Sequence, residues 1–319
     1  MTPVQLNWAL AGTVFVLLSA ATGVGQLLSR QPRLGLNPTA VNAFNGRLRA
    51  WWVICCVLVI TFLSRELTIV LFGLVSFWAL REFITLTPTR AGDHRALFWV
   101  FFFFTPLHYL LVSFDHYELY SILIPVYGFL FIPLRVAIAG DTKRFLERVA
   151  KIQSGLLVCV YCLGFAPALL YLDLGEEGGY AERSRLLFFL VIMSLVSEAL
   201  QFAWDRLYGR NVISASINGT RTWEGMLGGS ASAALVGLTL HVFTPFNELW
   251  HTALVSLLIA VMGFAGAMTM SAIKRDRGVK DFGTLVEGHG GVLDRIDTIC
   301  FAAPVFYHVT RQLLVTVSA

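Results

Sequence analysis

Long apolar segments alternate with short polar ones along almost the whole chain of 319 residues. A helix needs roughly 20 mostly apolar residues to cross a hydrocarbon core ~30 Å thick, and such segments recur from Trp8 to Val317. The pattern predicts ten spans, at residues 8–29, 50–64, 66–85, 96–113, 117–136, 154–173, 185–204, 226–244, 250–272 and 298–317. We therefore expect an all-α fold, a polytopic bundle of membrane helices.

The division between the second and third predicted spans rests on very few polar residues. Only Ser64, Arg65 and Glu66 separate the two apolar segments. A re-entrant hairpin or one long bent helix at this point would lower the number of spans. The pattern therefore predicts about eight to ten membrane helices.

The composition agrees with a membrane protein. The residues are 56% hydrophobic and 14% charged, whereas a soluble domain carries about 25% charged residues, so an ordinary soluble globular protein is excluded. The net charge of +4 is small and gives no indication of nucleic-acid binding. Thiols in apolar segments behave as small buried hydrophobes. We interpret all five cysteines in this way, namely Cys55, Cys56, Cys159, Cys162 and Cys300.

The basic residues indicate the orientation in the membrane. If the amino terminus faces outward, the outer loops hold only Arg65, Arg183, Arg185 and Arg311, and the other 20 of the 24 Lys and Arg residues face the cytoplasm. This positive-inside bias predicts an inner-membrane protein with both termini outside. The first seven residues contain no Lys or Arg, so we expect an uncleaved first span instead of a signal peptide.

Polar residues concentrate in the last third of the chain. We expect residues 1–185 to form an N-terminal transmembrane scaffold, and residues 186–319 to form a C-terminal catalytic region with cytoplasmic loops at 205–225 and 273–297. Eleven charged or histidine residues fall between Lys274 and Asp297. A loop that only sets topology needs a few positive charges, but not interleaved carboxylates. Acids and bases mixed with glycines suit a site for a metal ion and phosphate groups.

Such a site meets the requirements of nucleotidyl transfer. Carboxylates hold Mg²⁺, Lys and Arg neutralise phosphate, and glycines let backbone N–H groups approach phosphate oxygens. The attacking oxygen must also be aligned and the departing pyrophosphate stabilised. If residues 292–299 are helical, Asp294 and Asp297 lie three positions apart on one face and can reach one ion.

The segment 271–297 also resembles a family signature. In the integral membrane phosphatidate cytidylyltransferases, a family of CTP transferases, S-x-x-K-R is followed by K-D, H-G-G and D-R-x-D. The positions that match are Ser271, Lys274, Arg275, Lys280, Asp281, Gly283, His289, Gly290, Gly291, Asp294, Arg295 and Asp297. Val286 and Glu287 depart from the family pattern, but neither change removes a group that the chemistry needs.

A second block resembles the family stretch in which G-R or G-K is followed by S-P-x-K-T-W-E-G. Here Gly209-Arg210 precedes the segment 218–225, in which Arg221 replaces the usual Lys and Asn218-Gly219 replaces Ser-Pro. The family's intramembrane Asp corresponds by spacing to Glu198. The resemblance covers roughly residues 195–298, about a third of the chain.

The resemblance implies a Mg²⁺-dependent transfer of the cytidylyl group from CTP to phosphatidate, with a second metal ion left open. It implies catalytic roles for Asp281, Asp294, Asp297, His289 and Lys280. The implied metal ligands are Glu198, Asp281, Asp294 and Asp297. The implied contacts to CTP or lipid phosphates are Ser271, Lys274, Arg275, Arg221, Thr222, Gly290, Gly291 and Arg295. The expected partners are CTP, phosphatidate and membrane lipids, without nucleic acid, and a homodimer is left open.

Other interpretations apply to the same residues. Lys274 and Arg275 satisfy the positive-inside rule without a ligand, Glu198 could be solvated at the interface, and each Asp could simply pair with a neighbouring base. A CTP-dependent enzyme for another lipid phosphate or a polyprenol would share much of the pattern, although H-G-G and D-R-x-D argue against a polyprenol kinase. A transporter would suit ten spans, but we find no sign of the inverted halves common among transporters.

Overall fold

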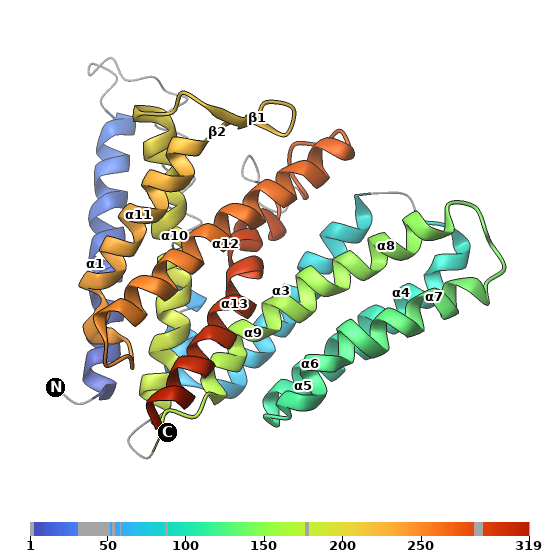
Figure 1. Cartoon of the computed structure of the whole chain (residues 1–319), viewed down its shortest axis with the longest axis horizontal. Helices are drawn as coiled ribbons and strands as arrows, with labels where there is room; N and C mark the ends of the chain where they lie inside the picture. The colour runs from blue at the N-terminus through green and yellow to red at the C-terminus, as the bar shows by residue number, and fades with distance from the viewer. Residues whose placement is uncertain are drawn as a thin grey trace.

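A computed structural model describes residues 3–30, 52, 55–57, 59–86, 89–175, 179–283 and 290–318 of the chain (Figure 1). Most of these residues are helical. The long uninterrupted helices are α1 (Pro3–Arg30), α3 (Arg65–Thr85), α10 (Tyr180–Leu207), α11 (Trp223–Thr239), α12 (Leu249–Asp276) and α13 (Leu293–Ser318).

Three further rods are each built from consecutive helical segments. The first contains η2 (Ala91–Asp93), α4 (His94–Trp99), η3 (Val100–Phe104) and α5 (Thr105–Ser113). The second contains α6 (Tyr117–Ile122), η4 (Leu123–Gly128) and α7 (Phe129–Ala137). The third contains α8 (Phe145–Leu156), η5 (Leu157–Cys162), α9 (Leu163–Ala168) and η6 (Leu169–Tyr171). The π-helical segment η4 of the middle rod contacts the π-helical segments η3 and η5 of its neighbours.

Seven of these helices and rods are long and apolar enough to cross a membrane, at Val4–Leu27, Arg65–Thr85, Ala91–Ser113, Tyr117–Ala137, Phe145–Tyr171, Tyr180–Leu207 and Leu249–Asp276. They coincide with seven of the ten predicted spans and confirm the polytopic helix bundle. Two further predicted spans correspond to α13 and to the 17-residue α11, which at 1.5 Å per residue extends only about 25 Å. The second predicted span is described in part, and its residues 55–57 and 59–63 are helical.

The break between the second and third predicted spans lies at Ser64. Its backbone is extended, with φ −154° and ψ 136°, and its hydroxyl accepts a hydrogen bond from the N–H of Leu67 at 3.3 Å. The serine oxygen thus satisfies one of the N–H groups that the first turn of α3 leaves unpaired. This cap excludes a single long helix through the two segments.

Small residues let α11 pack closely between α10 and α12. A Cβ at Gly229 would lie 2.5 Å from the Cα of Gln201, so only glycine permits this approach. The buried Gln201 amide donates hydrogen bonds to Ser230 Oγ at 3.3 Å and to Ala260 O at 3.0 Å. Small residues and such polar ties hold helices together in lipid, where apolar burial provides little drive. The three helices therefore form a tight unit.

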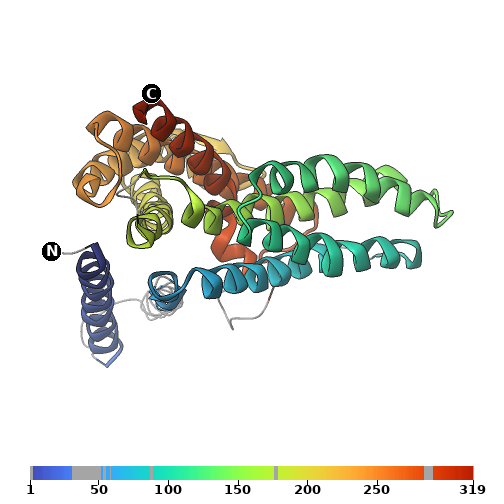
Figure 2. The same ribbon diagram turned by 90° about the horizontal axis from the view of Figure 1, so that it is seen from below.

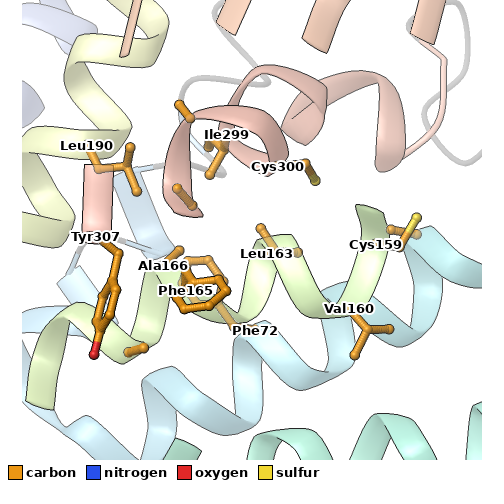
Figure 3. Close-up of a cluster of buried hydrophobic side chains, with 14 of the residues drawn as sticks. Phe72, Cys159, Val160, Leu163, Phe165, Ala166, Leu190, Ile299, Cys300 and Tyr307 are labelled. Atoms are coloured by element: carbon orange, nitrogen blue, oxygen red, sulfur yellow. The ribbon is translucent and has the colours of Figure 1, made fainter. Parts of the chain in front are cut away.

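The apolar core includes the contact between α9 and α13. Phe165 of α9 and Tyr307 of α13 lie side by side in this cluster of buried side chains, with ring centres 5.1 Å apart (Figure 3). All five cysteines are free, and both Cys159 and Cys300 are fully buried. Their burial agrees with the packing role expected from the sequence, whereas Cys56 is exposed.

A buried ion pair joins the first rod to the third. Arg148 Nη2 lies 2.6 Å from Asp93 Oδ1, and the two side chains are only 9% and 3% exposed. Arg148 also lies 3.4 Å from Asp141, which in turn binds Arg90 at 2.6 Å. Removing one partner of such a buried pair leaves an uncompensated charge and is strongly destabilising. The network therefore fixes the ends of two membrane rods to each other.

The predicted loop 205–225 contains a two-stranded antiparallel sheet, formed by β1 (Val212–Ser214) and β2 (Asn218–Thr222). The apolar pattern does not predict these strands, because they are short and mostly exposed. The hairpin lies at one end of the molecule and both marked chain ends lie at the other (Figure 1). Figure 2 shows α1 at the margin of the bundle, on the side away from α4 and α7.

Candidate active site

Asp294, in the first turn of α13, binds both described parts of the signature loop, which joins α12 to α13 and is described at residues 277–283 and 290–292. Its Oδ1 accepts a hydrogen bond from Lys274 Nζ at 2.8 Å. Its Oδ2 accepts hydrogen bonds from the backbone N–H groups of Phe282 and Gly291, at 2.8 and 2.9 Å. Both parts of the loop are thereby joined to α12 and α13. A carboxylate in this position also complements the positive end of the helix dipole.

Steric constraints explain why both positions after the histidine of the H-G-G motif are glycine. Gly290 has a φ of +81°, in the left-handed region that favours glycine, and a Cβ there would lie 2.8 Å from Asp294 Oδ2. A Cβ at Gly291 would overlap the carboxylate of Glu82. In this structure the glycines therefore bring the backbone close to two protein carboxylates. Their expected approach to a phosphate stays a prediction.

Asp297 lies one turn further along α13, just before the predicted apolar span 298–317. Loss of hydration on burial, and then the negative charge of Glu198 on α10, raise the pKa of Asp297 to about 7. Lys274 and Asp294 are also within electrostatic reach of Asp297. The structure thus places two other predicted metal ligands, Glu198 of α10 and Asp294 of α13, within electrostatic reach of Asp297.

Asp205, in the last turn of α10, organises the second block of the signature. Its Oδ1 accepts hydrogen bonds from the backbone N–H and the hydroxyl of Thr222, at 2.9 and 2.8 Å. Its Oδ2 lies 3.3 Å from Arg221 Nη1, and the Asp205 side chain is 5% exposed. Thr222 in turn caps α11, because its hydroxyl accepts a hydrogen bond from Gly225 N at 3.0 Å. One carboxylate therefore positions both predicted phosphate contacts of this block.

The hairpin is anchored at two further points. Arg275, at the end of α12, donates a hydrogen bond from Nε to Ile217 O at 3.2 Å. Glu224 accepts hydrogen bonds from the N–H groups of Arg210 and Asn211, at 3.2 and 3.1 Å. Hydrogen bonds from backbone N–H groups, that of Glu224 itself first, lower the pKa of this carboxyl to about 2. The two signature blocks are thus held against each other although they are far apart in sequence.

An open cleft of about 380 Å³ lies where the signature loop meets the end of α3. Lys280 and Asp281 line it and are exposed. Asp281 also lies near Asp294. A Cβ placed on Gly290 would lie 2.8 Å from Asp294 Oδ2 and 3.4 Å from Asp281 Oδ1, so the two carboxylates flank the same glycine. The residues that complete the lining are Thr85, Leu86, Val279, Phe282 and Gly283.

Three further predicted residues are Ser271, Arg295 and His289. Ser271 is half-buried on α12, one turn before Lys274, and Arg295 is half-buried in the first turn of α13. His289 lies outside the described residues.

The arrangement fits a divalent cation that receives part of its coordination from a substrate. Within the described residues, no three His, Cys, Asp or Glu side chains gather closely enough to hold a metal ion by themselves. Both oxygens of Asp294 are already engaged within the protein. The pair formed by Glu198 and Asp297 suits Mg²⁺ better, because this ion is usually held by one or two carboxylates together with phosphate oxygens and water.

Two residues at the site were missed by the sequence analysis. Asp205 has no counterpart in the quoted family blocks, and Glu82 lies on α3, far outside the region of resemblance. Glu82 could have been noticed as a carboxylate near the end of an apolar span, where ionisable groups are costly and usually functional. No comparable signal distinguishes Asp205 from the other charged residues of its loop.

The model of the cytidylyltransferase family matches residues 46–313, which is most of the chain. The chain belongs to this family. The resemblance noted in the signature blocks is therefore confirmed, and the match extends well into the N-terminal half. Cytidylyltransferase membership identifies the protein as a membrane-bound nucleotidyltransferase.

The chain is similar to one relative described as uncharacterized and to others named phosphatidate cytidylyltransferase. A protein of Escherichia coli K12 named YnbB, described as uncharacterized, is 38% identical over 304 residues, which cover 94% of this chain and 96% of that protein. The phosphatidate cytidylyltransferase of Staphylococcus haemolyticus is 30% identical over 169 residues, and that of Staphylococcus saprophyticus is 29% identical over 169. Both alignments cover 52% of this chain and 64% of the relative.

Proposed function

We propose that this cytidylyltransferase converts CTP and phosphatidate into CDP-diacylglycerol and pyrophosphate at the cytoplasmic face of the membrane. The proposal is carried by one observation, the meeting of the two signature blocks at one end of the bundle. Arg275 of the first block binds the hairpin of the second, and the charge of Glu198 on α10 acts on Asp297 of α13. The names of the staphylococcal relatives give the same reaction.

The reaction joins one phosphate oxygen to one phosphorus. An oxygen of the phosphatidate phosphate attacks the α-phosphorus of CTP, the bond from that phosphorus to the oxygen bridging the β-phosphate breaks, and pyrophosphate leaves with the electron pair. A phosphate monoester has a second pKa near 6, so the nucleophile is already ionised and needs no strong general base. The task of the protein is therefore positioning and charge neutralisation.

The basic residues are assigned to the phosphates. Arg221 is held by Asp205 through one nitrogen and presents the rest of its planar fork, which suits bidentate contact with phosphate. Lys280, exposed at the cleft, and Arg275 add positive charge, while Lys274 is neutralised by Asp294. We expect Lys280 and Arg221 to contribute most to CTP binding.

Mg²⁺, when bound, would neutralise and align the triphosphate. Glu198 and Asp297 are the carboxylates we assign to it, because their mutual repulsion is relieved by a cation between them. Asp281 at the cleft is a further ligand candidate, for this or a second ion. Asp294 is assigned to loop closure.

The orientation proposed from the charges places loops 205–225 and 273–297 in the cytoplasm and both termini outside the inner membrane. Two features support it. The hairpin and the chain ends lie at opposite ends of the molecule (Figure 1). The candidate site lies at the hairpin end, where soluble CTP would reach it.

Labelled nucleotide distinguishes this reaction from its alternatives. Purified protein in lipid nanodiscs is given CTP labelled at the α- or the γ-phosphate, with phosphatidate, a polyprenyl phosphate or a polyprenol. We expect α-label, but not γ-label, to enter organic-extractable lipid, and only with phosphatidate. Transfer of γ-label would indicate a kinase, and α-label transferred only to another lipid phosphate would change the substrate. Without incorporation from any acceptor the proposal fails.

A further inference from the structure

Glu82 is a buried carboxylate that reaches the signature loop from the N-terminal half of the chain. It lies near the C-terminal end of α3, three residues before the helix ends at Thr85, and is only 4% exposed. Its position is separated by 210 residues from the backbone group that it binds. A carboxylate so deeply buried must be compensated by hydrogen bonds.

Those hydrogen bonds come from the start of α13. The backbone N–H of Val292 donates to Glu82 Oε1 at 3.0 Å, and the N–H of Leu293 donates to Oε2 at 2.9 Å. Trp78, one turn earlier on α3, donates its indole N–H to Oε1 at 3.1 Å. Two consecutive N–H groups at a helix N-terminus are normally left unpaired. Glu82 therefore caps α13 from another membrane helix.

The same carboxylate also contacts both described parts of the signature loop. A Cβ at Gly283, in the first described part of the loop, would lie 2.7 Å from Glu82 Oε1, and one at Gly291, in the second part, would overlap Oε2. Beside it, Phe83 of α3 stacks on Phe282, with ring centres 6.3 Å apart and planes 14° apart. The backbone of the loop thus passes against α3 in both of these parts.

We propose that Glu82 is a positioning residue, which fixes the described parts of the signature loop on either side of residues 284–289 and the first turn of α13. Asp294 joins these parts to each other and to Lys274, and Glu82 fixes this assembly to the N-terminal scaffold. Lys280 lies three residues before Gly283, and Asp297 lies one turn after Leu293 on α13. The placement of both therefore depends on the contacts of Glu82. The consequence for catalysis rests on the proposed function, whereas the anchoring itself does not.

The variant Glu82→Gln tests the idea with little change in volume. Its amide retains one acceptor oxygen but turns an NH₂ group toward a backbone N–H donor, so one of the two caps is lost and a repulsive contact is gained. Loss of one hydrogen bond to a charged group should lower kcat/KM by roughly 10- to 100-fold. The matched control is Trp78→Phe, which removes the third hydrogen bond of Glu82 but no contact with the loop. Trp78 is 36% exposed, so water can replace its N–H and the variant should stay close to wild type.

Two readouts separate positioning from mere support of the fold. Kinetics per folded protein in nanodiscs should show Glu82→Gln raising KM for CTP and lowering kcat, with Trp78→Phe near wild type. Amide hydrogen exchange should accelerate at residues 292 and 293 in Glu82→Gln only. Unchanged kcat/KM together with unchanged protection would overturn the proposal, as would a loss confined to the amount of folded protein. If the wild type transfers no label from CTP, the proposed function fails, and the exchange measurement still decides whether Glu82 anchors the loop.

Discussion

Replacing Asp294 and Asp297 separately by Asn distinguishes loop closure from metal binding. Asp294→Asn keeps one acceptor oxygen and replaces the other by an NH₂ group. If the oxygen faces Lys274, the NH₂ group faces two backbone donors. In the reverse orientation the NH₂ group meets the ammonium of Lys274. Neither orientation preserves the three hydrogen bonds that the carboxylate accepts.

The expected cost follows from these contacts. A hydrogen bond to a charged group contributes about 1.5–3 kcal/mol, and the Asn side chain loses at least one while gaining an unfavourable donor–donor contact. We expect a loss of about 3 kcal/mol in the closed loop. Because 1.4 kcal/mol corresponds to a factor of ten, kcat/KM for CTP should fall by roughly 100-fold. No added cation replaces a missing loop contact, so high Mg²⁺ should not restore activity.

Asp297→Asn should behave differently. It removes half of a carboxylate pair that we assign to Mg²⁺, so the loss should be partly recovered at high Mg²⁺ or with Mn²⁺. The assay is transfer of α-label from CTP into extractable lipid across a Mg²⁺ titration, normalised to folded protein. Recovery of Asp294→Asn by metal, or wild-type turnover of both variants, would refute these separate roles.

Three further predictions concern the hairpin, the loop and the topology. Asp205→Ala leaves the largely buried guanidinium of Arg221 and the Thr222 N–H without their partner. Thermal unfolding in detergent should therefore show about 3 kcal/mol of lost stability. Gly290→Ala must place a Cβ at a φ of +81°, which costs about 1–2 kcal/mol and should lower activity about tenfold, whereas Gly12→Ala, with open space around it, should not. In a cysteine-free background, Arg144→Cys should react only with reagent on the cytoplasmic side and Asp173→Cys only with reagent outside. Reversed labelling would invalidate the proposed orientation.

The apolar pattern predicts most of the helices because membrane helices depend on local composition. Ser64 illustrates this dependence on local sequence, because its capping hydroxyl alone marks the start of α3. The helix expected at 292–299 begins at Leu293, which places Asp294 and Asp297 on one face of α13, as predicted. The strands β1 and β2 were not predicted, because their few residues lack the alternation that marks a longer strand.

The candidate site was predicted as a set of residues but not as a set of contacts. The signature identified Asp294 and Asp297 equally, yet the structure gives Asp294 three internal hydrogen bonds and places Asp297 within electrostatic reach of Glu198. Glu82 was missed because its partner lies 210 residues away, and pairing over such a separation depends on how whole helices pack. Local sequence patterns therefore do not predict this contact.

The ion pair between Asp93 and Arg148 also bears on how the protein is made. Synthesis proceeds from the amino terminus, so Asp93 emerges from the ribosome 55 residues before the arginine that neutralises it. Until the third rod is inserted, this acid lacks the arginine that neutralises it and must stay in contact with water or headgroups, because burial of an uncompensated charge is costly. Final docking of the first rod therefore waits for the third, which gives the nascent chain a required order of assembly and a point at which an incomplete bundle is distinguishable from a finished one.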